Sequence, residues 1–404
     1  MAKSTKTSAL GSPRIAHLSS ARTSGAITAK YAEALIEGGA DVRIFASREK
    51  AHEFEGSLVA TSAPVLDLPF GKRALARSAF YTARLQLMTM GPKIVIAEDP
   101  ELLKFAAKYA RIARARLVYM PFEYYPGAAY ATPELQRRWR LIERRLAPAI
   151  AAWIIPGDKI AELYAGAIAP AEVVHVVYNG SPRRVPERAP KLRRALGVGP
   201  EVKILLYQGS VQERRGIWDV LGALPLLPSF VHFAVLGMGE LNRLRQDAAS
   251  LGLRDRVHVL DAVPQAELSD YTKDADVGLI PIHNTCVSYD LCNPGKLFEY
   301  IGASLPLAVS RLTQLEWFVT LHGLGEVFDL RSPSSLAQAV LRLLEDDAYR
   351  EQCRSRCQRL QATSVCWEVQ ADKLRRIVLG LCDPSTEVSH GTPGTDAHRP
   401  TVLQ

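Results

Sequence analysis

The stretch SYDLCNPGKLFEYIGASLPLAVS, residues 288–310, carries the strongest fold signal in the chain. It predicts a loop, a short helix and then a buried strand formed by a run of apolar residues. Asn293 is a preferred N-cap residue, and Pro294 suits the first helical position because its missing N–H would have no partner there. The pattern therefore predicts a helix that begins directly after Asn293.

A helix that begins there would offer an anion site at its N-terminus. The amides of Gly295, Lys296 and Leu297 would be free, with the positive end of the helix dipole behind them. Lys296 and Glu299 are three residues apart and share a helix face, which combines a cation for phosphate with a carboxylate for hydroxyl groups. The alternative is an ordinary capped helix with an ion pair, and the rest of the sequence decides between the two.

Length and composition indicate a globular protein of two domains. The chain has 404 residues, of which 48% are hydrophobic and 23% are charged. No apolar run is long enough to span a bilayer, and the polar N-terminus MAKSTKTSALGSPR has no apolar signal core, so we expect a cytoplasmic protein. The six cysteines form no C-x-x-C pair, which predicts reduced thiols and no zinc site.

The net charge of +8 comes largely from the arginine clusters RRWRLIERR, PRRVPER and KLRR. Such charge can serve nucleic acid, an anionic membrane surface or a polyphosphate ligand, or it can be a solvated surface. No zinc finger, basic zipper or aromatic RNA-binding motif accompanies it, so we expect no nucleic-acid partner. Attraction of these basic clusters to the inner membrane surface is kept as an alternative.

Strand and helix patterns alternate along the first half of the chain. RIAHLSS, AITAKYAEALIE and ADVRIFAS predict a strand–helix–strand unit with parallel strands. No G-x-G-x-x-G follows the first strand, so the dinucleotide fingerprint is absent. Ligands bind at the carboxyl ends of such strands, where the sequence places Ser24, Gly25, Asp99 and Glu123. Each of these residues also suits a plain turn or cap.

The alternation restarts after a stretch rich in proline, glycine and arginine. The sequence thus predicts an α/β fold of two Rossmann-like, doubly wound domains that face a cleft. The predicted parts are a flexible leader (1–13), a first domain (14–180), a linker (181–200), a second domain (201–362), a terminal helix (363–382) and a disordered tail (383–404).

Three segments of the second domain are expected to meet at one sheet edge. In YQGSVQERRG, Gly209 and Ser210 follow a predicted strand, where a glycine permits close approach of a ligand. Arg214 and Arg215 lead from there into a helix, and guanidinium groups suit a diphosphate. The second segment is LGMGE, and the third is the helix start within 288–310.

In LGMGE, Gly237 and Gly239 follow a strand and form either a ligand-binding loop or a tight turn. No D-x-D pair is present in the three segments, and their positive groups supply charge themselves, so we expect neither a metal nor a cofactor. Three such segments at one edge of one sheet favour a functional site over separate turns.

These motifs resemble one family. YQGSVQERRGIWDVLGAL, FAVLGMGE, NPGKLFEYIGASLPLAVS and the interdomain VVYNG resemble the GT-B glycosyltransferases of the family 4 type, which use nucleotide sugars and retain the anomeric configuration. The resemblance covers residues 14–380, more loosely in the N-terminal half, at AEDPELLKF and LVYMPFE. It implies an acceptor-side first domain, a donor-binding second domain and a terminal helix, with Trp367, that packs back on the first domain.

The resemblance assigns roles by position. Glu299 would bind the ribose, and Lys296 and Arg215 would bind the diphosphate. Val263 would lie where the backbone meets the nucleobase. The donor-binding set is Gly209, Ser210, Arg214, Gly237, Gly239, Val263, Asn293, Gly295, Leu297 and Glu299.

Several positions depart from the family pattern. The family often has two glutamates eight positions apart, but Leu291 stands eight before Glu299, with Asp290 beside it as a substitute. Of the D-x-H-E signature, the segment MPFE at 120–123 keeps only the glutamate. Ser210 stands where many relatives have an arginine. Donor binding is thus better supported than turnover.

We therefore predict transfer of a sugar from a UDP- or GDP-linked donor to an acceptor hydroxyl, with retention and without a metal. Arg215 and Lys296 would stabilise the departing diphosphate, while Glu123 would position or deprotonate the acceptor. The acceptor, a glycan, glycolipid or metabolite in anionic or membrane-linked form, is expected near Gly25 and Asp99. Two alternatives remain, a catalytically silent GT-B scaffold that binds a nucleotide and a GT-B sugar-nucleotide epimerase.

Overall fold

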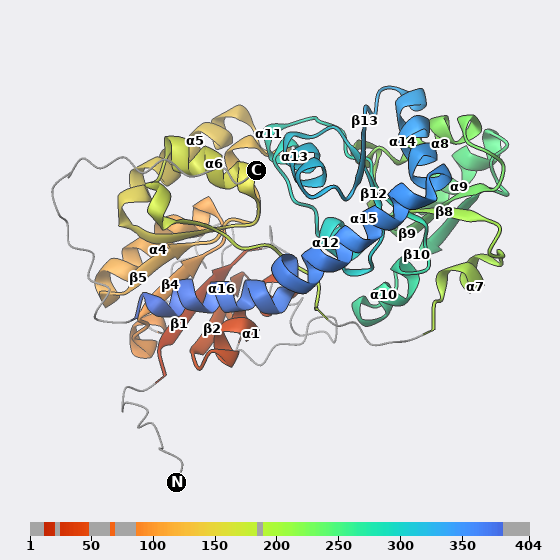
Figure 1. Cartoon of the computed structure of the whole chain (residues 1–404). Coiled ribbons are helices and arrows are strands. Elements are labelled where there is room, and N and C mark those ends of the chain that lie inside the picture. The colour runs from red at the N-terminus through yellow and green to blue at the C-terminus, as the bar shows by residue number, and fades with distance from the viewer. Residues whose placement is uncertain (1–11, 21–24, 48–64, 69–85, 184–188, 383–404) are drawn as a thin grey trace, which may run out of the picture.

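The computed structural model describes residues 12–20, 25–47, 65–68, 86–183 and 189–382. The predicted tail, Ser24 and most of the predicted leader lie outside these ranges. The described chain forms two α/β domains side by side, each built on a parallel sheet (Figure 1). The predicted fold class is confirmed.

The first domain has a seven-stranded parallel sheet in the order β3-β2-β1-β4-β5-β6-β7. The predicted strand–helix–strand unit opens it, and Arg14 of β1 pairs with Asp41 of β2. The elements are β1 (Arg14–Ser19), α1 (Gly25–Glu37), β2 (Asp41–Ser47), β3 (Val65–Leu68), β4 (Ile94–Ala97), α4 (Pro100–Ala113), β5 (Arg116–Tyr119), η1 (Tyr125–Gly127), α5 (Pro133–Leu146), η2 (Ala147–Ala149), β6 (Ile150–Ile155), α6 (Asp158–Ala167), η3 (Ala171–Val173) and β7 (Val174–Val176).

The second domain has a six-stranded parallel sheet in the order β10-β9-β8-β11-β12-β13. The predicted linker contains a short helix, α7. The elements are α7 (Leu192–Leu196), β8 (Lys203–Val211), η4 (Glu213–Arg215), α8 (Ile217–Ala223), η5 (Leu224–Leu226), β9 (Val231–Gly239), α9 (Leu241–Ser250), β10 (Val257–Asp261), α10 (Gln265–Thr272), β11 (Val277–Ile280), α11 (Val287–Asp290), α12 (Gly295–Gly302), β12 (Leu307–Ser310), α13 (Thr313–His322), β13 (Gly325–Phe328), α14 (Pro333–Glu345), α15 (Asp347–Leu360), η6 (Gln361–Val365) and α16 (Trp367–Gly380).

The strand order locates the edge at which a ligand is expected. The order reverses between β1 and β4 in the first sheet and between β8 and β11 in the second. Parallel α/β sheets bind ligands in the crevice outside the carboxyl ends of the strands at such a point. The end of β8, which contains Gly209 and Ser210, is therefore the expected binding edge of the second domain.

The chain crosses between the domains twice, and the two crossings contact each other. The first passes through Gly180 and Ser181, and the second through the π-helical turn η6. Trp367 N donates to the carbonyl oxygen of Ser181 over 2.8 Å. A Cβ on Gly180 would lie 1.8 Å from the carbonyl oxygen of Val365, so only glycine fits. Beyond this point α16 lies on the first domain (Figure 1). The ring centroids of Trp367 and Tyr31 of α1 are 5.0 Å apart there.

A carboxyl group is buried inside the first domain. Glu143 of α5 is fully buried, and Tyr119 and Tyr164 both donate to its Oε1 at 2.9 Å. Burial raises the pKa of Glu143 to about 7, and the two tyrosine hydrogen bonds oppose this shift. The folded protein therefore binds this proton more tightly than the unfolded chain does.

Glu143→Gln should change how stability depends on pH. Because folding raises this pKa, the linked stability is fully present below the unfolded value of 4.5 and is lost as pH rises through about 7. Glutamine does not titrate, so the stability of the variant relative to wild type should increase with pH, by at most about 1.4 kcal/mol per unit. Thermal unfolding at about pH 5 and about pH 8 measures the difference. A difference that is the same at both pH values would contradict the buried titration.

Candidate functional site

The predicted loop glycines lie in strands. β8 and β9 continue as far as Val211 and Gly239, so that Gly209 pairs with Gly237, and Val211 pairs with Gly239. The tight turn expected as one alternative at Gly237 and Gly239 is absent, since both residues pair with β8, where the two backbones approach too closely for side chains. A Cβ on Gly237 would lie 1.9 Å from the carbonyl oxygen of Gly209. Gly209 also has a φ of 122°, which favours glycine.

Helix α12 begins one residue later than predicted. Pro294 is its N-cap residue, and the side chain of Asn293 instead donates through Nδ2 to the carbonyl oxygen of Pro156 in the first domain, at 3.1 Å. The amide of Leu297 donates to the carbonyl oxygen of Pro294, so the prediction that this amide is free is wrong. The first two amides of α12 have no backbone acceptor among the described residues. These two remain available for a phosphate.

Lys296 is a buried cation close to a second cation. Its side chain is 9% exposed, and Nζ lies 3.8 Å from the centroid of the Tyr207 ring. Burial, and then the charge of Arg215, lower the pKa of Lys296 to about 7. Nε of Arg215 is buried and has no hydrogen-bond partner in the described part of the chain. Two neighbouring cations of this kind make a site that favours an anion.

Gln208, which sequence reasoning missed, holds Glu299 in place. Its Nε2 donates to Glu299 Oε2, and its Oε1 accepts from Thr272 Oγ1 at 2.9 Å. The reverse amide orientation would turn the carbonyl oxygen toward the carboxylate, so Glu299 fixes the orientation. Gln208 is 2% exposed. The available signal was a polar residue at the end of the apolar strand KILLYQ.

A cavity of about 350 Å³ joins these groups. Its volume is in the range of small-molecule pockets. Apolar walls come from Leu236, Met238 and Leu268. The predicted site residues that line it are Gly209, Ser210, Gly237, Val263, Lys296 and Glu299. The predicted residues outside this lining are Arg214, Arg215, Gly239, Asn293, Gly295 and Leu297.

Glu123 contacts both domains. Its Oε1 accepts from the hydroxyl of Tyr130 at 2.6 Å, and its Oε2 accepts from Ser288 Oγ of the second domain at 2.9 Å. Each carboxylate oxygen thus has a partner within the protein. The expected role of Glu123 toward an acceptor stays a prediction, and the structure adds an interdomain contact that the sequence did not indicate.

The other acceptor-side residues lie at helix starts. Asp99 is fully buried and is the N-cap of α4, where it accepts from the amide of Leu102 at 2.9 Å. This is the capping role that the sequence offered as an alternative. Gly25 is the first residue of α1, and Ser24 lies outside the described residues.

The position of the missing family glutamate faces the first domain. Leu291 is 8% exposed and belongs to the apolar core cluster of that domain. Asp290, the expected substitute, accepts from the amide of Thr313 at 3.0 Å and from its hydroxyl at 2.7 Å. Asn284 Nδ2 also donates to Asp290, at 2.8 Å. Asp290 therefore anchors the start of α13, and its role as a substitute for the glutamate stays a prediction.

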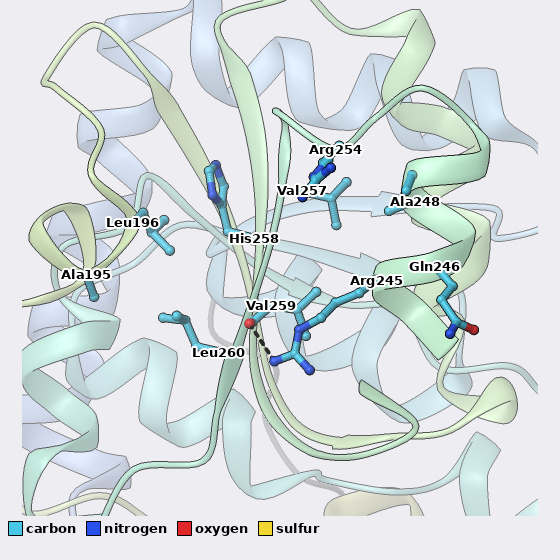
Figure 2. Close-up of a pocket in the computed structure, with 11 residues that line it drawn as sticks. Ala195, Leu196, Arg245, Gln246, Ala248, Arg254, Val257, His258, Val259 and Leu260 are labelled. Atoms are coloured by element: carbon cyan, nitrogen blue, oxygen red, sulfur yellow. Dashed lines mark hydrogen bonds between the residues drawn. The ribbon is translucent and has the colours of Figure 1, made fainter. Parts of the chain in front are cut away.

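A separate hollow of about 510 Å³ lies at the edge strand β10 (Figure 2). Residues of α7, α9 and β10 line it, and none of them belongs to the predicted site. Arg245 donates to the carbonyl oxygen of Val259 at 3.0 Å, which covers part of the free sheet edge (Figure 2). Within the described ranges, no group of three metal-binding side chains is found. None of the helices described is both long and apolar enough to cross a membrane.

Two family models match the two domains. Residues 23–180 match a glycosyl transferase 4-like domain, and residues 202–346 match the glycosyl transferases group 1. The chain belongs to the GT-B glycosyltransferases. In this glycosyltransferase, Gln208, Lys296 and Glu299 all lie in the group 1 domain.

Curated relatives of this glycosyltransferase match part of their length. The D-inositol 3-phosphate glycosyltransferase of Thermobispora bispora is 30% identical over 213 residues, which cover 49% of this chain and 47% of the relative. An uncharacterised glycosyltransferase of Methanocaldococcus jannaschii is 28% identical over 193 residues, which cover 45% of this chain and 47% of the relative. The chain spans about half the length of the curated relatives that it matches.

Solved structures show the same fold over most of the chain. Anabaena HepE in complex with UDP has a TM-score of 0.74 at 16% identity, and the match covers 91% of this chain and 100% of that protein. Sucrose-phosphate synthase of Thermosynechococcus elongatus has a TM-score of 0.72 at 16% identity, and the match covers 92% of this chain and 99% of that one. At this identity the likeness shows the GT-B fold alone.

Affinity for a nucleoside diphosphate should fall as pH rises above about 7. Lys296 has a pKa of about 7 in the empty site, and a bound diphosphate favours its charged form, so binding above that pH takes up a proton. The dissociation constant should then rise by up to roughly tenfold per pH unit. Titration calorimetry with UDP and GDP measures it, and Lys296→Arg, which stays charged, should show a flat profile. A flat profile for wild type would contradict the role of Lys296.

Proposed function

We propose that this glycosyltransferase moves a sugar from a UDP-sugar to an acceptor hydroxyl with retention at the anomeric carbon. The single observation that carries the proposal is the convergence of Lys296, Arg215, two free amides of α12 and Glu299 at the end of β8. The group 1 family match and the UDP complex of Anabaena HepE, whose fold is the same, support it.

Donor binding follows from the groups that line the cavity. The nucleoside would occupy the cavity of about 350 Å³, with Val263 on its wall. Glu299 would accept hydrogen bonds from the ribose hydroxyls, and Gln208 would keep the carboxylate oriented for them. The diphosphate would lie at the start of α12, where the first two amides and the helix dipole favour negative charge.

The reaction would gain most from charge stabilisation of the leaving group. As the bond from the anomeric carbon to the diphosphate oxygen breaks, negative charge grows on the diphosphate. Lys296 and Arg215 would stabilise this charge, and they act more strongly in the transition state than in the ground state. Lys296 and Nε of Arg215 are buried, so little water screens the interaction there. In this proposal the protein's own cations and amides supply the positive charge.

The acceptor would bind on the side of the first domain. Gly25 at the start of α1 and Glu123 after β5 lie at carboxyl ends of the first sheet. Arg137, Arg138 and Arg140 on α5 of the same domain favour an anionic or membrane-linked acceptor at the inner membrane surface. UDP is favoured over GDP because it is the nucleotide bound by the structural neighbour.

A catalytically silent nucleotide-binding scaffold is the second candidate. It is favoured by Leu291, whose apolar side chain is buried where the family has a carboxylate. Both candidates bind a nucleotide, and they differ only in turnover. Incubation with UDP-sugars separates them, because hydrolysis or transfer excludes the scaffold.

Glu299→Ala should weaken binding of UDP roughly 10- to 100-fold, the usual effect of losing hydrogen bonds to a charged group. The matched control is Gln246→Ala, an exposed residue of α9 that does not line the cavity. Calorimetry with UDP gives both affinities, and release of UDP from UDP-sugars gives turnover. Unchanged affinity in Glu299→Ala would overturn the ribose contact, and absence of turnover with every UDP-sugar would leave the scaffold.

A further inference from the structure

The four-residue helix α11 belongs to the second domain in chain order but packs on the first domain. Ser288 donates to Glu123 at 2.9 Å, and Leu291, directly after the helix, lies in the apolar core cluster of the first domain. A Cβ on Gly127 would lie 2.8 Å from Cβ of Val287, so α11 touches the first-domain backbone itself. The docked helix is thus part of the contact between the domains.

The same helix also contacts the arginine pair of the donor site. The ring centroid of Tyr289 lies 5.3 Å from the guanidinium carbon of Arg215 and 5.9 Å from that of Arg214. Nε of Arg215 is buried without a hydrogen-bond partner in the described chain, so the aromatic ring is a main contact of this guanidinium. Arg214 has an additional hydrogen bond, to Gln212 Oε1 at 3.1 Å.

The order of α11 depends on its docking. A helix of four residues is too short to be stable by itself. Asp290 anchors one end to Thr313 of α13, and Tyr289 packs against the apolar core of the second domain. Ser288 and Leu291 make the contacts to the first domain. Leu291 would lose its apolar environment if the domains separated. Because Ser288 and Leu291 stand on either side of Tyr289 in the chain, docking of α11 on the first domain helps to set the orientation of its ring.

We propose that Tyr289 is a positioning residue that holds Arg215 toward the departing diphosphate, and that Leu291 docks α11 on the first domain to set this position. The inference rests on the proposed function, because it uses the leaving-group role of Arg215. The contact between the domains that docks α11 then also completes the diphosphate site. The sugar donor is activated only when the first domain contacts α11, and this limits hydrolysis of the donor by water. An apolar residue at 291 is what this docking requires.

Tyr289→Leu tests the positioning role. Loss of the ring should lower kcat by about 2- to 30-fold, the range for a cation–π contact between exposed and desolvated settings. KM for the UDP-sugar should change less, since charge on the diphosphate grows in the transition state. Tyr289→Phe keeps the ring and should restore the wild-type kcat. Steady-state release of UDP gives both constants, and melting temperatures show that each variant folds.

Leu291→Ala tests the link to docking. It should lower kcat in the same direction, and the double variant with Tyr289→Leu should lose no more than the worse single variant, because both changes act through Arg215. The matched control is Leu321→Ala, a leucine of α13 that is 60% exposed, which should leave kcat unchanged.

The outcomes separate this inference from the proposed function. If wild type shows no turnover, the proposed function fails and the inference fails with it. If Arg215→Ala keeps full activity, sugar transfer stands, but the leaving-group role of Arg215 and the inference that uses it are overturned. If Arg215→Ala is impaired while Tyr289→Leu is not, only the positioning role is overturned. Equal losses in Tyr289→Leu and Tyr289→Phe would also overturn it. Losses that multiply in the double variant would overturn the link to docking.

Discussion

The close approach of two cations, Lys296 and Arg215, is the interaction on which the donor site depends. Burial and the neighbouring guanidinium lower the pKa of Lys296, so the empty site holds its charge at a cost. The cation–π contact of Lys296 with Tyr207 offsets part of this cost, and the apolar core that packs β8 against α12 holds Lys296 in place. A diphosphate would relieve the repulsion, so the same strain that weakens the empty site favours binding of the donor.

The cavity is shaped by backbone as much as by side chains. Gly209 and Gly237 let β8 and β9 run on together to the binding edge, where side chains would collide. Gln208 ends the buried part of β8 and turns its amide to Glu299, so strand and helix are joined by a hydrogen bond at the site. The first domain contacts this part of the second domain at α11 and at Asn293, whose side chain donates to the carbonyl oxygen of Pro156. Both domains thus contribute to the order of a site whose cavity lining comes from one.

Much of the fold could be predicted from local pattern. RIAHLSS and KILLYQGS are continuous apolar strands followed by helices with apolar residues at helical spacing, and such alternation leaves few arrangements other than parallel sheets. β13, GEVF, was missed because three of its four residues are only partly buried, so it has no apolar run. Glycines usually interrupt a strand pattern, but Gly237 and Gly239 lie opposite β8 and allow the two strands to pair to the end of β9.

Local sequence pattern was enough to predict that Lys296, Glu299 and the glycines after two strands gather at one sheet edge. The reason is that parallel strands all present their carboxyl ends on the same side. Only the tertiary structure decided that Asn293 leaves the helix cap for Pro156, and that Ser288 and Leu291 face the first domain. These contacts join residues more than a hundred positions apart, so no local pattern encodes them. The competition between a local cap and a distant partner is settled only when both domains are folded and in contact.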